Sequence, residues 1–374
     1  MTFSFLHTAD WQLGKRFGSF PGDKPAVLRD QRLQAVDRVA EAALAAKCSA
    51  VLVAGDVFDA ETVPEALCGQ LMARLNSYSA LAWHLLPGNH DPARAGGVWT
   101  TLAGKLPANV RLHLEARPAD MAPGVVLLPS PLTSKRTSSD PTAWMDGVVT
   151  PAGTLRIGLA HGSVQGFGSA GEANVPIDPA RVKSAGLNYL ALGDWHGTTR
   201  ISDRAWYSGT PEPDGFRDND PGNALIVRVD GAAAPKVERV ATAHFTWLRR
   251  ELKVDNEAAL QPIEAEILRL GSGAARTLLT LELAGAVPMT ELARIEERLG
   301  NMAPQLFHLA HDMAGISVFA DAADLEALSS PSLADIARRL KETSERGGDD
   351  AAVAARALRR LFTLARQSEA RARS

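Results

Sequence analysis

The stretch Val51-Leu52-Val53-Ala54-Gly55-Asp56-Val57-Phe58-Asp59 holds an apolar run that ends abruptly in glycine and carboxylates. A short apolar run of this kind, bounded by glycine, is typical of a buried strand. The pattern returns at residues 82–91, where the apolar run stops at Pro87 and Gly88-Asn89-His90-Asp91 follows. Two buried strands that each run directly into polar residues predict an α/β sheet with reactive side chains at its strand ends.

Helical patterns separate the predicted strands. Residues 26–47 show the apolar stripe of a long amphipathic helix, and residues 64–76 that of a second. Further strands are predicted at the following ranges: 3–6, 125–128, 155–160, 189–192 and 223–229. Strands punctuated by helices predict a layered α/β domain, which we expect to end at residue 243.

The pattern changes beyond residue 243. Short strand and helix patterns alternate over residues 244–325, which predicts a small α+β capping domain. Residues 326–374 predict two amphipathic helices separated at Gly347-Gly348. We therefore expect three parts, with a C-terminal helix-loop-helix as the last.

Composition excludes several classes of protein. The 374 residues carry 40 basic and 43 acidic side chains, so a globally cationic nucleic-acid binder of the histone type is excluded. Only Cys48 and Cys68 occur, which excludes a disulfide framework and a thiolate zinc cluster. The first residues lack a signal-peptide pattern, and no run approaches the roughly 18 apolar residues of a membrane span. We expect a cytoplasmic protein that does not enter a membrane.

Five polar clusters directly follow predicted strands and would meet at one edge of the fold. They are Asp10-Trp11-Gln12, Gly55-Asp56-Val57-Phe58-Asp59, Gly88-Asn89-His90-Asp91, His161-Gly162 and Gly193-Asp194-Trp195-His196. Their metal-ligating side chains are Asp10, Gln12, Asp56, Asn89, His161, Asp194 and His196. Taken singly, each loop aspartate could equally form a turn or cap a helix. Because the Asp56 carboxylate can bridge two cations, the set would suffice for a binuclear centre.

The series resembles the calcineurin-like metallophosphoesterase signature of D-x-H, G-D-x-x-D, G-N-H-D, a lone H and G-H-x-H. More narrowly, Leu6-His7-Thr8-Ala9-Asp10-Trp11, Ala54-Gly55-Asp56-Val57-Phe58-Asp59 and Ser208-Gly209-Thr210-Pro211 resemble the SbcD-like DNA repair exonucleases. The resemblance implies a layered α/β/β/α sandwich with a small cap and a helical tail.

The resemblance also implies two divalent cations. One would be bound by Asp10, Gln12, Asp56 and His196, and the other by Asp56, Asn89, His161 and Asp194. Gln12 and Asp194 stand where the family has histidines. Since these departures add oxygen donors, they favour Mn²⁺, or else Mg²⁺, over zinc.

Catalytic roles follow from the same resemblance. His90 lies one residue beyond the ligand Asn89, so we expect it to face the leaving oxygen as an acid or a charge stabiliser. Asp91 is expected to orient the His90 imidazole. Asp59 is expected to support the cluster.

Nucleic-acid binding rests on weaker signals. Lys15 and Arg16, with Arg32 further on, follow the first cluster, and Lys135-Arg136 lies in another loop. These residues could neutralise DNA phosphates, although a solvated basic face is the alternative.

The tail helices have apolar stripes that suit a partner helix pair. By resemblance this partner would be an SbcC-like SMC-type ATPase, with the nuclease as a homodimer, whereas a hairpin folded back on its own domain is the alternative.

The sequence therefore predicts an SbcD-like metal-dependent nuclease that hydrolyses phosphodiester bonds in DNA, acting as an exonuclease or endonuclease. Two alternatives stay open. One is a phosphodiesterase for a small nucleotide, although the cap and tail would then have little use. The other is a DNA-end-binding subunit whose site lost activity through Gln12 and Asp194.

Overall fold

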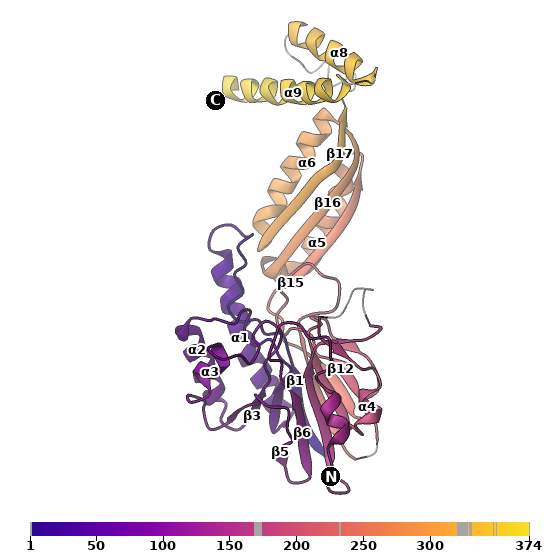
Figure 1. Ribbon diagram of the computed structural model, residues 1–374. Helices are drawn as coiled ribbons and strands as arrows, with labels where there is room; N and C mark the ends of the chain where they lie inside the picture. The colour runs from indigo at the N-terminus through magenta and orange to yellow at the C-terminus, as the bar shows by residue number, and fades with distance from the viewer. Residues whose placement is uncertain are drawn as a thin grey trace. The chain divides into compact units, whose positions relative to one another are not determined.

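The computed structural model describes residues 2–167, 174–231, 233–319, 328, 331–346, 348 and 350–373. The chain divides into two compact units, Met1–His244 and Phe245–Ser374 (Figure 1). Within the described residues, no helix combines the length and apolar character that crossing a membrane requires.

The first sheet of the N-terminal unit has six strands in the order β14-β13-β1-β2-β3-β4. They are β1 (Phe3–Thr8), β2 (Ala50–Val53), β3 (Ala82–Leu85), β4 (Val110–Leu112), β13 (Asn223–Val229) and β14 (Lys236–Ala241). Strands β1 to β4 are parallel, and β13 joins β1 in antiparallel register. The parallel strands all end at the same edge.

The second sheet has the order β11-β12-β10-β7-β6-β5. Its strands are β5 (Ala119–Ala122), β6 (Val125–Ser130), β7 (Leu155–His161), β10 (Tyr189–Gly193), β11 (Thr199–Arg200) and β12 (Ala205–Tyr207). A separate pair is formed by β8 (Ser163–Val164) and β9 (Pro176–Ile177). The central strands β6, β7, β10 and β12 are parallel.

Alternating side chains divide the apolar residues of each strand between two faces. On β1 and β2, Phe5 and Leu52 belong to a buried cluster that also contains Ile157 and Tyr189 of the second sheet. This cluster is the layer between the two sheets. Their neighbours in the chain pack instead against the helices outside, so the strands are apolar on both faces.

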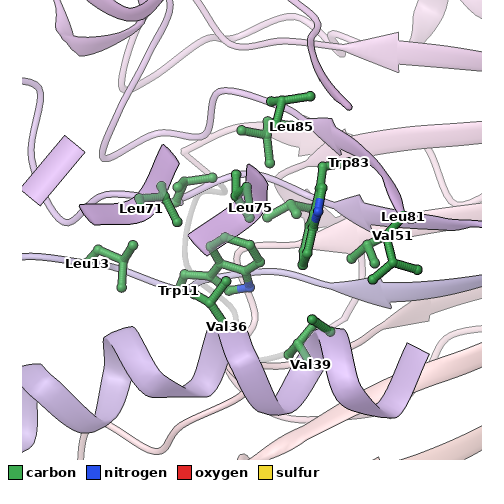
Figure 2. Close-up of a cluster of buried hydrophobic side chains, with 14 of the residues drawn as sticks. Trp11, Leu13, Val36, Val39, Val51, Leu71, Leu75, Leu81, Trp83 and Leu85 are labelled. Atoms are coloured by element: carbon green, nitrogen blue, oxygen red, sulfur yellow. The ribbon is translucent and has the colours of Figure 1, made fainter. Parts of the chain in front are cut away.

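Helices cover the outer faces of both sheets. The first sheet carries α1 (Lys24–Ala45), α2 (Glu65–Ser77) and α3 (Val98–Leu102). The second carries the short helices η1 (Ala143–Gly147) and α4 (Arg181–Ser184). Figure 2 shows the apolar core between the first sheet and its helices. In this core the rings of Trp11 and Trp83 meet edge to face, with their centroids 6.0 Å apart. The layered α/β/β/α prediction is confirmed.

The C-terminal unit contains a three-stranded sheet of β15 (Thr246–Val254), β16 (Thr277–Pro288) and β17 (His308–Phe319), parallel and in that order. Its helical segments are η2 (Glu257–Leu260), α5 (Gln261–Leu270), η3 (Gly271–Arg276), α6 (Met289–Met302) and η4 (Ala303–Gln305). The apolar faces of α5 and α6 form a core with the sheet.

Two further helices follow, α8 (Pro331–Glu345) and α9 (Ala351–Arg373). Ala337 of α8 and Leu358 and Phe362 of α9 are buried together against Met289 at the start of α6. The predicted boundary at residues 325–326 and the predicted break at Gly347 lie outside the described residues.

Two buried histidines at the first sheet make the stability of the fold depend on pH. His84 Nδ1 lies 3.0 Å from His113 Nε2, and the two rings are stacked. Burial lowers the pKa of His84 to about 3 and that of His113 to about 4, helped by the positive charge of Arg111. Because these values lie below the unfolded pKa of about 6.5, both rings stabilise the fold as neutral groups above that pH. This stability is lost as the pH falls from about 6.5 towards 4.

We predict that each of the two histidines removes about 1.4 kcal/mol of unfolding free energy between pH 7.5 and 5.5, because the unfolded state then takes up a proton that the folded state does not. Urea unfolding of the wild type and of His113→Gln at both pH values measures this. The wild type should lose about 1.4 kcal/mol more than the variant. Equal losses would contradict the neutral, buried state of His113.

Candidate metal centre

The predicted ligands converge where β1, β2, β7 and β10 end, together with the loop after β3. The first two clusters are joined by backbone hydrogen bonds, because the Asp10 N–H donates to the Gly55 carbonyl (3.1 Å) and the Gln12 N–H to the Asp56 carbonyl (2.8 Å). Asp10, Gln12, Asp56 and Asp194 all have positive φ angles, of 55°, 41°, 53° and 102°. Such backbone strain in residues other than glycine concentrates at functional sites.

Two glycines let these segments approach closely. A Cβ on Gly88 would lie 2.1 Å from Asp56 Oδ1, and one on Gly193 would lie 2.0 Å from the Ala54 carbonyl oxygen. Neither position can accept a side chain without moving a ligand segment. This explains why glycine precedes both Asn89 and Asp194 in the sequence.

Carboxylates and one imidazole form the buried centre. Ligand atoms of Asp10, Asp56 and His161 lie within 4.8 Å of one another, and all three side chains are buried. Asp194 is tied to them, since its N–H donates to Asp10 Oδ1 (3.1 Å) and its Oδ1 accepts from Asn89 Nδ2 (3.1 Å). Its other oxygen accepts from Ser163 Oγ at 2.6 Å. No sequence pattern pointed to Ser163.

Two atoms of the centre have lone pairs without a partner among the described residues, Asn89 Oδ1 and His161 Nε2. His161 Nδ1 lies 2.8 Å from the Ala54 carbonyl oxygen, to which it donates, so Nε2 is left as the acceptor. That nitrogen lies 3.4 Å from Asp56 Oδ1 and 3.8 Å from Asp194 Oδ1. Two ligands of one cation, at roughly 2–2.3 Å each, have such separations. The residues present therefore fit a divalent cation.

The electrostatics of the centre also favour a cation. Burial alone would lower the pKa of His161, but the carboxylates of Asp56, Asp10 and Asp194 raise it to about 9. Without a cation the ring therefore takes up a proton at Nε2, which a bound cation would replace. Burial raises the pKa of Asp10 to about 6, against the opposing charges of His196 and His161. Like charges gathered out of water destabilise one another. A bound cation would relieve this repulsion.

His196 and Gln12 lie in a hydrogen-bonded network with Lys15 and Asp214. His196 Nδ1 is 3.1 Å from Asp214 Oδ1, and Gln12 Nε2 is 3.2 Å from His196 Nε2. Lys15 Nζ donates to Gln12 Oε1 (3.0 Å) and to Asp214 Oδ2 (2.5 Å). Asp214 was missed because it follows no predicted strand. Lys15 therefore lies beside the predicted ligands, and its contact with DNA phosphates stays a prediction.

The other predicted basic residues differ in their surroundings. Arg32 is buried and donates to the carbonyl oxygens of Trp11 (2.9 Å) and Asp10 (3.0 Å), so it braces the first cluster instead of facing DNA. Lys135 is exposed and forms an ion pair with Glu61 at 3.2 Å. The side chains of Arg16 and Arg136 are also solvent-accessible. These accessible residues remain a predicted DNA contact.

His90 and Asp91 point in different directions. His90 is 45% exposed in its side chain, and its Nδ1 lies 3.1 Å from the Asp59 carbonyl oxygen. Its N–H donates to Asp56 Oδ1 at 2.9 Å. The buried Asp91 carboxylate accepts from the backbone N–H groups of Gly88 (2.7 Å) and Phe58 (2.9 Å). Asp59, not Asp91, thus orients the His90 ring, because consecutive side chains in this loop face opposite ways.

We predict that Asp91→Ala destabilises the fold by at least about 2 kcal/mol, since two buried N–H groups lose their acceptor. His90→Ala should change the unfolding free energy by no more than about 0.5 kcal/mol, because its side chain is nearly half exposed. Urea unfolding of both variants makes the comparison. An Asp91→Ala variant as stable as the wild type would rule out the bracing role.

A comparison with known protein families covers part of this site. Residues 3–163 match the family model of the calcineurin-like phosphoesterases, a range that includes the predicted ligands from Asp10 to His161. Residues 3–163 thus carry a calcineurin-like phosphoesterase domain, which implies a metal-dependent phosphoester hydrolase. The match stops before Asp194 and His196.

Solved structures with a similar chain include TT1561 of Thermus thermophilus and a dimetal phosphatase from Danio rerio. The first is 11% identical, with a TM-score of 0.41 over 65% of this chain and 100% of that one. The second is 12% identical, with a TM-score of 0.39 over 64% of this chain and 99% of that one. Among curated proteins, no sequence matches the chain.

Proposed function

We propose that this protein is a metal-dependent nuclease of the SbcD-like type, which hydrolyses phosphodiester bonds in DNA. The observation that carries the proposal is the pair of lone pairs on His161 Nε2 and Asn89 Oδ1, beside the carboxylates of Asp56 and Asp194, with the exposed His90 next to them. Such a site would place a bound cation next to His90, which can donate a proton.

Oxygen donors dominate the proposed ligand set. Asp56 and Asp194 offer carboxylates and Asn89 an amide oxygen, whereas His161 adds one imidazole. Oxygen-rich sites prefer Mn²⁺ or Mg²⁺ to zinc. We take Mn²⁺ as the cofactor.

The chemistry divides between the cation and His90. A bound divalent cation supplies Lewis acidity toward the phosphate and lowers the pKa of a water. The Asp59 carbonyl holds His90 through Nδ1, which leaves Nε2 to pass a proton to the leaving oxygen. The Asp56 carboxylate fixes the His90 backbone through its N–H. His90 is therefore held at two points beside the ligands while its ring edge stays open.

DNA as the substrate class is supported by the openness of this edge. The His90 side chain is 45% exposed, so a polymeric ester can reach it from solvent. Arg16, Lys135 and Arg136 are solvent-accessible cations of the same unit and can pair with backbone phosphates. A small nucleotide would favour an enclosed pocket, whereas the His90 side chain is nearly half exposed.

We predict Mn²⁺-dependent cleavage of end-labelled double- or single-stranded DNA. His90→Ala should lower the rate by about 10²–10⁴-fold, the usual loss for a general acid, without loss of Mn²⁺ binding. His311→Ala, which changes an exposed histidine of β17, is the matched control and should cleave like the wild type.

Bis-p-nitrophenyl phosphate, assayed beside the DNA, distinguishes the alternatives. Hydrolysis of this ester without DNA cleavage would contradict the nuclease and favour a small-nucleotide phosphodiesterase. No hydrolysis of either substrate would contradict the enzyme and favour a DNA-end-binding subunit.

We further propose that α8 and α9 dock on an SbcC-like SMC-type ATPase and that the nuclease forms a homodimer. Both helices bury one face in their shared core. Outside it, Ile336 is 48% exposed, Val353 55% and Leu364 48%. Apolar side chains left on two paired helices suit a helical partner.

We predict that Ile336→Glu with Val353→Glu abolishes co-elution with the SMC-type ATPase, because the two charges would be buried in the contact. Val149→Glu, which replaces a 94% exposed valine of the N-terminal unit, is the matched control and should bind normally. Light scattering on the nuclease alone gives its mass and tests the homodimer. Undiminished binding by the double variant would contradict the docking surface.

A further inference from the structure

Two pairs of predicted ligands differ in whether their donor atoms already have hydrogen-bond partners. In the first pair, Asn89 Oδ1 and His161 Nε2 have no hydrogen-bond partner within the described part of the chain. In the second pair, Gln12 Oε1 accepts from Lys15 Nζ, and the Gln12 amide nitrogen lies 3.2 Å from His196 Nε2. A cation at the second pair would have to compete with these hydrogen bonds, whereas one at the first pair would not.

Lys15 sets the orientation of the Gln12 amide. An ammonium only donates hydrogen bonds, so it must face the amide oxygen, and the opposite orientation would bring two donors together. The amide N–H therefore points at His196 Nε2. His196 Nδ1 is held by Asp214 Oδ1 at 3.1 Å, which leaves Nε2 as the acceptor. The Gln12 amide thus occupies the lone pair with which His196 would bind a metal.

The ammonium also brings a positive charge to this position. Lys15 Nζ lies 2.5 Å from Asp214 Oδ2, and the Asp214 side chain is only 7% exposed. A cation coordinated by Gln12 Oε1, at about 2.0–2.6 Å, would lie within about 6 Å of Lys15 Nζ. Like charges at that separation repel, and if Lys15 moved away, the mostly buried Asp214 carboxylate would lose an ion pair and keep its contact with His196.

We propose that this centre binds a single divalent cation through Asp56, Asn89, His161 and Asp194, and that the ammonium of Lys15 replaces the second cation which the resemblance implies. The inference rests on the proposed function for the use of the site. It changes the positive charge that would face a phosphodiester, because one divalent cation and one lysine ammonium would take the place of two divalent cations.

Titration of the full chain with Mn²⁺ alone, by calorimetry and electron paramagnetic resonance, tests this. The wild type should bind one Mn²⁺ per chain, with the hyperfine spectrum of isolated ions. Lys15→Met combined with Gln12→His should bind two and give a spin-coupled spectrum. Lys15→Arg with Gln12→His, which keeps the positive charge, is the matched control and should still bind one.

Two Mn²⁺ per wild-type chain with a coupled spectrum would overturn the inference, as would a count of one in the Lys15→Met, Gln12→His variant. His161→Ala should bind none, and a retained ion would show that the assigned group is wrong. Circular dichroism checks that each variant is folded. If the double variant does not fold, the wild-type count still decides.

DNA cleavage by the same wild-type preparation separates this inference from the proposed function. One bound Mn²⁺ without cleavage would overturn the nuclease and support the single-cation site. Two bound Mn²⁺ with cleavage would overturn the single-cation site alone.

Discussion

The repulsion among carboxylates that the fold brings together at its strand ends is the constraint on which the candidate metal centre depends. The buried Asp10 and Asp56 and the partly exposed Asp194 come from three different strand ends and meet beside His161. Buried like charges cannot all stay ionised unless positive charge joins them. The two sheets pack through apolar side chains, while these carboxylates gather at one edge, which is left with an excess of negative charge. A cation is the simplest group that balances it.

Three basic side chains lie around this edge and differ in their exposure to solvent. Arg32 is fully enclosed and serves backbone carbonyls, so it fixes the shape of the first loop. Lys15 is partly exposed and ends on Asp214 and Gln12, between the interior and solvent. His90 is the most exposed, and its ring is held through the Asp59 carbonyl. Bracing, charge balance and proton transfer are thus assigned to three groups of increasing exposure to solvent.

Much of this site could be predicted from sequence because strand ends are readable. Apolar runs that stop at glycine locate Asp56, Asn89, His161 and Asp194 without a structure. The sequence does not show in which direction consecutive loop side chains point. Asp91 was therefore expected to orient the His90 ring, whereas its carboxylate accepts hydrogen bonds from the backbone N–H groups of Phe58 and Gly88. Ser163 and Asp214 could not be found either, since each acts through long-range contacts that leave no local pattern. The basic residues near the first cluster looked alike in sequence, and only burial separates Arg32 from the accessible Arg16.

Anomalous scattering from crystals grown with Mn²⁺ tests the central claim most directly, because it locates the cation independently of activity. We expect one anomalous peak, bounded by Asp56, Asn89, His161 and Asp194, with Lys15 still on Asp214. A peak between Gln12 and His196, or no peak among the strand ends at saturating Mn²⁺, would contradict the account.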